Sequence, residues 1–368
     1  MRVFILSDVN NIHTKRWVKA LAERGIDIFL FGFYQEAGRE YAAYKNVQVY
    51  GCFKKFGNFW GSKVKYLFTL REIKRKIREF KPDIVHAHYA SSYGLLGALT
   101  GFHPYIISVW GADVYDFPKS YLWGKAILRY NLKKADLILS TSYIMARETG
   151  KYTEKKIGIT PFGVDLTRFR NLSVKKGESF VVGNVKTLSP KYGIDVLIRA
   201  FSRIVERNPG LKTELVIVGE GPKRKEYEKL ACLLGLAGKV KFEGWVAHDR
   251  LPEYYNRFSV AVSVSVRDSE SFGVVAVEAM ACECPVVVSD ADGFTEVVKD
   301  GETGFIVPKG DVEATAEAIQ VFIDRPELRQ KMGERGRKRV TRLYDWEKNV
   351  EEMVKVYNQV CLKGGGKT

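Results

Sequence analysis

Two glutamates eight positions apart are the residues of this sequence whose type and spacing most suggest chemistry. Glu270 lies between two serines at the mouth of an apolar segment, and Glu278 lies within a run of Val, Ala and Met. A buried carboxylate is costly unless a partner binds it. The pair therefore predicts a polar ligand near the start of this segment.

The local pattern around the glutamates indicates how such a ligand would bind. Residues 260–266 read as a buried strand and residues 272–281 as the helix that follows it. In parallel sheets, ligands bind at the carboxyl ends of strands, where helix N-termini present free N–H groups. We expect Ser271 to cap the helix and Gly273 to let a ligand approach the backbone closely. The first-turn amides would hold a phosphate, the glutamate within the helix two ribose hydroxyls, and the other glutamate a second polyhydroxylated group.

The rest of the chain predicts the elements that position these residues. Short apolar runs alternate with amphipathic helical stretches, which is typical of parallel sheets wrapped by helices. The expected strands of the first part are 3–8, 26–33, 83–89, 105–111 and 136–142. Those of the second part are 179–186, 214–221, 239–245, 260–266, 284–290 and 303–309. Helices are expected at 15–25, 193–208 and 224–235, among others.

The alternation breaks once, in a loop-rich segment with Pro and Gly at residues 159–179, which we interpret as an interdomain linker. A chain of 368 residues also exceeds one ordinary core. We therefore expect an α/β protein with two doubly wound, Rossmann-like domains, residues 1–165 and residues 174–345. A last helix, 346–362, should complete the first domain.

Seven further motifs lie in order along nearly the whole chain: "DIVHAH", "SVWGADV", "PFGVDLTRF", "GNVKTLSPKYGIDVLIRAF", "LVIVGEGP", "FEGWV" and "DGETGFIV". Together with Glu270-x7-Glu278, they resemble the retaining nucleotide-sugar glycosyltransferases of family 4. Two glutamates at this spacing would be weak evidence alone, whereas seven collinear motifs are strong evidence. The resemblance implies the GT-B fold, in which two Rossmann-like domains face each other across a cleft, with the acceptor over the first domain and the nucleotide sugar in the second.

The resemblance also implies roles residue by residue. Glu278 would bind the ribose hydroxyls, while Glu270 and the amides of Phe272 and Gly273 would hold the donor sugar and distal phosphate. Two lysines would neutralise the diphosphate leaving group, which has no metal to stabilise it. The implied nucleotide-binding positions are Glu278, Phe272, Gly273, Val274, Trp245, Val246 and Gly183. The implied catalytic positions are Glu270, Lys186, Lys191, His13 and Asp113.

Two positions depart from the family pattern. Lys186 stands where relatives usually have arginine, so a point charge replaces a bidentate fork. Trp110 stands where many relatives have a histidine that touches the transferred sugar. His13 or His88 could take over that contact, or the donor could need none. The Gly-rich loop that many relatives carry after the first strand is also replaced, by "SDVNNIHTKRW".

The expected function is transfer of a sugar, with retention, from a nucleotide diphosphate sugar to a glycan or lipid-linked acceptor. The nucleotide sugar is a co-substrate, and no cofactor is expected. A covalent intermediate requires a carboxylate beside the reacting carbon, and none is identifiable in the first domain, so front-face attack is preferred. A GT-B nucleotide-sugar epimerase and a non-catalytic nucleotide-sugar-binding protein are the alternatives. A dinucleotide oxidoreductase is disfavoured, because no Gly-x-Gly-x-x-Gly follows the first strand.

The net charge of +16 is concentrated in the first part of the chain, where residues 1–165 contain 26 Lys and Arg against 14 Asp and Glu. It peaks in the basic aromatic strip 54–81, which mixes ten basic residues with Phe, Trp and Tyr. Such a strip suits an anionic membrane surface or a lipid phosphate. A solvated basic helix of a heat-adapted protein is the alternative. No nucleic-acid-reading motif accompanies the charge, so no nucleic-acid partner is expected.

Neither a membrane span nor a signal peptide is expected, because no apolar run approaches ~18 residues and the first strand is followed by polar residues. We expect a cytoplasmic protein that could dock peripherally on the inner face of the membrane. The five scattered cysteines read as reduced, and Cys282 and Cys284 as a buried pair at a helix end. "DAD" at 290–292 resembles the metal clasp of the other large glycosyltransferase fold. That clasp does not follow a buried strand of a doubly wound domain, so no metal site is expected.

Overall fold

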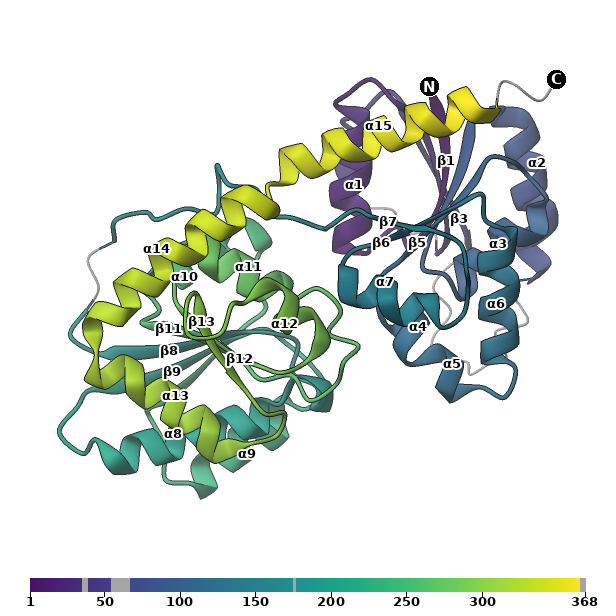
Figure 1. The fold of residues 1–368 in the computed structure, drawn as a ribbon. Coiled ribbons are helices and arrows are strands. Elements are labelled where there is room, and N and C mark those ends of the chain that lie inside the picture. Colours follow the sequence, from purple (N-terminus) through teal and green to yellow (C-terminus); the bar gives the residue numbers. More distant parts are fainter. Residues whose placement is uncertain (35–38, 54–66, 175–176, 365–368) are drawn as a thin grey trace. The chain divides into compact units, whose positions relative to one another are not determined.

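The computed structural model describes residues 1–34, 39–53, 67–174 and 177–364, and the chain forms two compact units (Figure 1). The first unit consists of Met1–Pro161 and Lys348–Thr368, and the second of Phe162–Glu347. Each unit contains one parallel sheet with helices packed on it. The expectation of two doubly wound α/β units is confirmed.

The first unit is built on seven parallel strands in the order β3-β2-β1-β4-β5-β6-β7. The strands before and after the β1–β4 pair are added on opposite sides, so the strand order reverses between these two parallel neighbours. The strands are β1 Arg2–Leu6, β2 Asp27–Tyr34, β3 Val47–Phe53, β4 Ile84–His88, β5 Tyr105–Val109, β6 Leu137–Ser140 and β7 Ile157–Ile159. The helices are α1 Ile12–Ala22, α2 Leu70–Phe80, α3 Ser92–Thr100, α4 Ala112–Tyr115, α5 Phe117–Ser120, α6 Gly124–Lys134 and α7 Tyr143–Gly150, with a 3-10 turn η1 Arg39–Tyr41. The long helix α15, Trp346–Gly364, belongs to this unit from Lys348 onward.

The second unit has six parallel strands in the order β10-β9-β8-β11-β12-β13, again reversing beside its first strand. The strands are β8 Phe180–Val185, β9 Thr213–Val218, β10 Val240–Gly244, β11 Val260–Ser263, β12 Val286–Ser289 and β13 Gly304–Val307. The helices are α8 Ile194–Arg207, α9 Arg224–Leu233, α10 Leu251–Arg257, α11 Val274–Ala281, α12 Asp292–Val297, α13 Val312–Asp324 and α14 Pro326–Leu343. Two 3-10 turns, η3 Pro190–Tyr192 and η4 His248–Arg250, lie in its loops.

Every strand expected from the sequence is present, but β3 and β7 were not predicted. Both are edge strands of the first sheet. An internal strand of a parallel sheet is covered on both faces and reads as a continuous apolar run, as in the fully buried β4 and β5. The edge strand β3 carries Gln48 and Gly51, and β7 has only three half-buried residues. Edge strands are less buried, so their sequence signal is weaker. Among the described residues, no helix is both long and apolar enough to cross a membrane.

A buried polar network lies in the core of the first unit. His86 and His88, on β4, are 0% and 2% exposed. His86 Nδ1 is 2.7 Å from the Tyr357 hydroxyl of α15, and its Nε2 is 2.8 Å from Ser108 Oγ on β5. His88 Nδ1 is 3.2 Å from Ser7 Oγ. Burial lowers the pKa of His88 to about 3 and holds the pKa of His86 well below its usual value, so both rings are neutral at physiological pH.

This network predicts that the first unit loses stability in mild acid. In the unfolded chain, histidine has a pKa of about 6.5, so below that pH the unfolded state binds protons that the folded state does not. The stabilisation is present above pH ~6.5 and is lost as the pH falls toward the folded pKa. We expect the free energy of unfolding to be about 1.4 kcal/mol lower per histidine at pH ~5.5 than at pH ~7.5, measured by urea denaturation. The His88→Gln variant should have a shallower pH dependence than wild type, and equal slopes would contradict the prediction.

Candidate functional site

Three predicted residues meet at the carboxyl ends of β8 and β11 in the second unit. Lys186 directly follows β8, and its Nζ is 2.5 Å from Glu270 Oε2, on the loop after β11. Lys191, in η3, donates to the Ser269 carbonyl at 2.9 Å. Lys186 is not a solvated surface residue, because its side chain is only 10% exposed. An ion pair and a hydrogen bond thus connect the loop after β8 to the loop after β11.

The Glu270 carboxylate is buried yet ionised. Burial alone would raise its pKa, but the charges of Lys186 and Lys191 and hydrogen bonds from Lys186 and Ser265 outweigh that effect and lower the pKa. Ser265 Oγ lies 3.2 Å from the same carboxylate oxygen that Lys186 contacts. Both ammonium groups also flank the ring of Tyr192, with Nζ-to-centroid distances of 4.7 Å for Lys186 and 5.3 Å for Lys191. The site therefore has two ammonium groups around one carboxylate.

Helix α11 begins beside this cluster, but not as expected. Its N-cap is Gly273, in the left-handed region at φ 74°, and no side chain caps the helix, so the expectation that Ser271 is the cap is wrong. The cause lies in the preceding loop, where the Gly293 amide donates to the Glu270 carbonyl at 2.8 Å and holds the chain on α12. A Cβ on Gly273 would lie 2.7 Å from the Phe294 ring. The Ala276 N–H donates to the Gly273 carbonyl at 3.0 Å, while the N–H groups at the very start of a helix have no acceptor within it.

Of the other predicted residues at this helix start, Phe272 is packed in the core and Val274 is half-buried. Phe272 is buried against the rings of Phe162 and Tyr344, and Val274 is the first residue of α11. Ser269 is 6% exposed, and its hydroxyl has no hydrogen-bond partner among the residues that the structure describes. An unpaired buried hydroxyl beside two ammonium groups is a place where a ligand or water oxygen would be bound.

Glu278, in the middle of α11, is 3% exposed and has two partners that the sequence did not reveal. His248 Nε2, in η4, is 2.7 Å from Oε1, and the Tyr255 hydroxyl, on α10, donates to Oε2 at 3.0 Å. Burial and the Glu278 charge raise the pKa of Tyr255 well above its usual value, which keeps the phenol protonated as the donor. A carboxylate oxygen accepts more than one hydrogen bond, so each oxygen of Glu278 retains acceptor capacity.

The predicted positions Trp245, Val246 and Gly183 range from exposed to buried. Trp245 follows β10 and is 75% exposed, so its ring is available as a stacking platform, while its neighbour Val246 is half-buried. Gly183 is buried in β8, and a Cβ there would lie 2.1 Å from the ring of Phe258. Packing against Phe258 is sufficient to require glycine at that position.

The first unit gathers its own predicted residues around Trp110, which is half-buried beside two histidine rings. The ring centroids of His13 and His88 lie 6.0 and 4.6 Å from that of Trp110. Asp113 is fully buried and accepts hydrogen bonds from the backbone N–H groups of Ala90 at 2.7 Å, Gly111 at 2.8 Å and Trp110 at 3.2 Å. Burial raises the pKa of Asp113, and these backbone bonds oppose the shift. Its carboxylate thus organises the backbone that carries Trp110.

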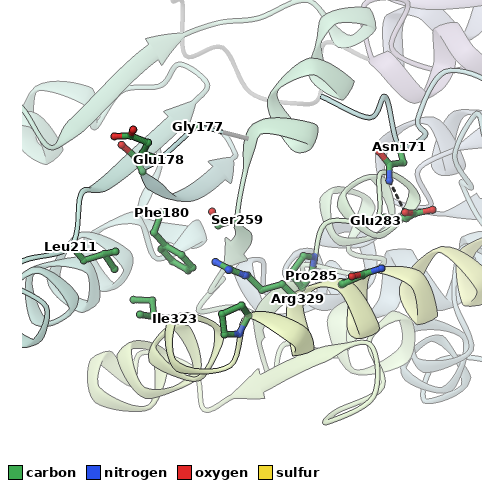
Figure 2. Close-up of a pocket in the computed structure, with 13 residues that line it drawn as sticks. Asn171, Gly177, Glu178, Phe180, Leu211, Ser259, Glu283, Pro285, Ile323 and Arg329 are labelled. Atoms are coloured by element: carbon green, nitrogen blue, oxygen red, sulfur yellow. Dashed lines mark hydrogen bonds between the residues drawn. The ribbon is translucent and has the colours of Figure 1, made fainter. Parts of the chain in front are cut away.

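A hollow of about 570 Å³ lies elsewhere in the second unit (Figure 2). Phe180, Ser259 and Pro285 line it, and these residues lie at or next to the amino ends of β8, β11 and β12. Figure 2 shows Arg329 pointing into it and the bond between Asn171 and Glu283 at its rim. Lys186, Lys191 and Glu270 lie at the carboxyl ends of β8 and β11, and none of the predicted site residues lines the hollow. We therefore identify the candidate site by its charged and polar side chains and not by this hollow.

The residues considered as metal ligands have other surroundings. Among the described residues, no group of three or more His, Cys, Asp and Glu side chains is arranged to hold a metal ion. Asp290 accepts a hydrogen bond from the backbone of Lys309 at 2.9 Å. Cys282 and Cys284 are buried free thiols, and burial raises the pKa of Cys282.

Each of the two units matches a family model of glycosyltransferases. Residues 166–339 match the family model of glycosyl transferases group 1, and residues 2–142 match that of glycosyl transferase 4-like proteins. An uncharacterized glycosyltransferase of Methanocaldococcus jannaschii is 27% identical over 355 residues, which cover 95% of this chain and 94% of that protein. EpsD of Bacillus subtilis, a proposed glycosyltransferase, is 30% identical over 316 residues, 79% of this chain and 80% of EpsD.

The fold is also found among solved structures. HepE of Anabaena, solved with UDP-glucose, superposes with a TM-score of 0.78 at 19% identity, covering 98% of this chain and 100% of HepE. The same protein has been solved with UDP. At this identity the likeness shows the fold alone.

The buried ion pair predicts strong coupling between Lys186 and Glu270. The Lys186→Met variant should lose about 3 kcal/mol of unfolding free energy, because removing one partner of a buried pair leaves an uncompensated charge. Adding Glu270→Gln to that variant should recover a large part of the loss, since the remaining group is then neutral. Urea denaturation of wild type, both single variants and the double variant measures the coupling. Additive losses would show that the two side chains do not stabilise each other.

Proposed function

The chain belongs to the group 1 glycosyltransferases, nucleotide-sugar-using enzymes of the GT-B fold, and from this we propose that it transfers a hexose with retention to a glycan or lipid-linked acceptor. The family resemblance stated from the motifs is thereby confirmed, whereas retention, metal independence and the acceptor class are proposals. The observation that carries the proposal is the cluster of Lys186, Lys191 and Glu270 at the start of α11.

The donor is proposed to bind at the carboxyl ends of the second unit's strands. Glu278 would accept hydrogen bonds from two ribose hydroxyls through the acceptor capacity left by His248 and Tyr255. The exposed ring of Trp245 would border the base. The HepE complexes hold UDP and UDP-glucose, so UDP-glucose is the first donor to test. Glu270 would accept from hydroxyls of the donor sugar.

Departure of the nucleoside diphosphate is the step that these residues would accelerate. Negative charge develops on the diphosphate as the glycosidic bond breaks. The ammonium groups of Lys186 and Lys191 and the first-turn amides of α11 would stabilise that charge from fixed positions. Because two cations and a helix N-terminus supply this stabilisation, we propose that the reaction needs no metal ion and no cofactor.

Retention is proposed to proceed by front-face attack. A covalent intermediate would need a carboxylate free to attack the sugar. In this structure the Glu270 carboxylate is paired with Lys186 and Ser265, and that of Asp113 is bound by backbone N–H groups. Neither carboxylate is therefore suited to act as a nucleophile. The acceptor would bind to the first unit near His13, and Asp113 would act as a positioning residue.

The strip 54–81, which suggested a membrane partner, is only partly within the described residues. Residues 54–66 lie outside the described residues. In α2, which forms most of the remainder, Arg75 pairs with Glu72 and Glu79, and Lys76 pairs with Glu79 at 2.9 Å. These pairs fit the alternative of a solvated basic helix in that part of the strip. A cytoplasmic location, peripheral to the inner face of the membrane, is kept as a proposal.

Donor binding is tested by thermal shift with a panel of UDP-, GDP- and ADP-sugars. A donor at 100 times its Kd should stabilise the protein by about 2.7 kcal/mol. The Glu278→Ala and Lys191→Ala variants should lose this shift while remaining folded, because the ribose and diphosphate contacts are removed. Lys229→Ala, which changes an exposed lysine of α9, is the matched control and should keep the shift. If both site variants shift like wild type, the site assignment is wrong.

Retention is tested on the product. With the stabilising donor and a panel of glycan and lipid-linked acceptors, we expect the transferred sugar to keep the anomeric configuration of the donor, read from the proton coupling at the anomeric carbon by NMR. An inverted product would exclude the proposed front-face mechanism. Interconversion of the donor without any acceptor would favour an epimerase, and binding with no turnover a non-catalytic sensor.

A further inference from the structure

The turn between α5 and α6 exposes three consecutive apolar residues. Leu122 is 93% exposed, Trp123 is 71% exposed and Tyr121 is 47% exposed. Figure 1 shows the two short helices joined by this turn in the first unit. Single exposed apolar residues are ordinary on protein surfaces, but three in sequence at a tip form a patch that indicates an interaction.

This tip is held in a fixed conformation. The Gly124 amide donates to the Tyr121 carbonyl at 2.9 Å, and the Ile127 amide to the Trp123 carbonyl at 3.0 Å, which ties the tip to the start of α6. A Cβ on Gly124 would lie 2.5 Å from the Phe117 carbonyl oxygen, so the backbones on either side of the turn are in close contact. The apolar side chains are therefore presented to solvent by a packed turn.

The charged residues of the segment that carries the tip are all basic, between Asp116 and Asp136. Residues 117–135 contain no Asp or Glu. They contain five basic residues, all exposed: Lys119, Lys125, Arg129, Lys133 and Lys134. None of the five has an ion pair with any carboxylate in the described part of the chain, in contrast to the paired charges of α2. The exposed residues of α6 recur every three or four positions, so its cations lie on one face, opposite buried Leu128 and Leu132.

An exposed Leu–Trp tip beside cations that form no ion pair within the described residues matches the chemistry of an anionic lipid bilayer. Indole and aliphatic side chains partition into the interface between headgroups and acyl chains, and lysines and arginines are attracted to anionic headgroups. A second copy of the chain would bring the same cations and repel them. A nucleic acid would satisfy the cations but would offer no apolar environment to Leu122.

We propose that the surface formed by Tyr121, Leu122, Trp123 and the basic face of α6 docks the protein on membranes containing anionic phospholipids. We call it the α5–α6 docking surface. It shares no residue with the strip 54–81 or with the proposed donor site of the second unit. Failure of this proposal would therefore leave the proposed transferase activity standing.

The test is sedimentation of the full chain with vesicles of phosphatidylcholine alone and with a quarter of phosphatidylglycerol. Wild type should co-sediment only with the anionic vesicles, and less at ~0.5 M than at ~0.05 M salt. The double variant Leu122→Ser, Trp123→Ser should bind at least about tenfold more weakly, because it removes the inserted apolar surface. Each of Lys125→Gln and Arg129→Gln should weaken binding by about fivefold.

Matched controls in the second unit make the result specific. Leu233, on α9, is 74% exposed, and Leu233→Ser should leave vesicle binding unchanged, as should Lys229→Gln on the same helix. Fluorescence quenching by brominated acyl chains should occur in wild type and be reduced in Trp123→Phe. The proposal is overturned if wild type ignores anionic vesicles or if the double variant binds like wild type. It is also overturned if the double variant only converts a dimer to a monomer in gel filtration, which would make the surface an interface between copies.

Discussion

An ionised carboxylate buried beside a helix start is the feature on which the second unit's site depends. Glu270 is stable there because Lys186 is in direct contact and Lys191 is close by. The pair links residues 84 positions apart in sequence and so fixes the loop after β8 against the loop after β11. A diphosphate entering this site would meet Lys186, paired with Glu270, and Lys191, which donates to the Ser269 carbonyl. Two lysines beside one carboxylate therefore give the site an excess of positive charge, which favours an anion.

Glu278 shows the same principle with partners that are not lysines. Its buried carboxylate is oriented by a histidine and a tyrosine that come from two other elements, η4 and α10. In the first unit, Asp113 is satisfied by backbone N–H groups alone. Three buried carboxylates thus have three kinds of partner: lysine ammonium groups, a histidine with a tyrosine, and backbone N–H groups. Only the first two leave a polar surface with which a ligand can exchange hydrogen bonds, whereas the third stabilises a loop.

The sequence was sufficient for the internal strands and for the burial of the two glutamates, because continuous apolar runs report burial directly. The two lysines were indicated by the family resemblance, and the roles of all four residues stay predictions. It was insufficient for His248 and Tyr255, which reach Glu278 from 30 and 23 positions away and belong to no recognisable spacing. Ser271 was wrongly expected to cap α11, because a tertiary hydrogen bond from Gly293 overrides the local capping preference. The tip at Leu122 went unnoticed, since exposure of an apolar residue cannot be read from its neighbours.

The helix α15 constrains when the first unit can finish folding, because it lies at the end of the chain. Its residues from Lys348 onward belong to that unit, and Tyr357 on it completes the hydrogen bonding of buried His86. The first unit is therefore interrupted in sequence by the whole of the second. During translation the ribosome must deliver Phe162–Glu347 before the last piece of the first unit emerges. Domains usually fold as they are synthesised, from the N-terminus onward. Here the unit begun first can be finished only last, and a gene shortened before Tyr357 would leave it incomplete.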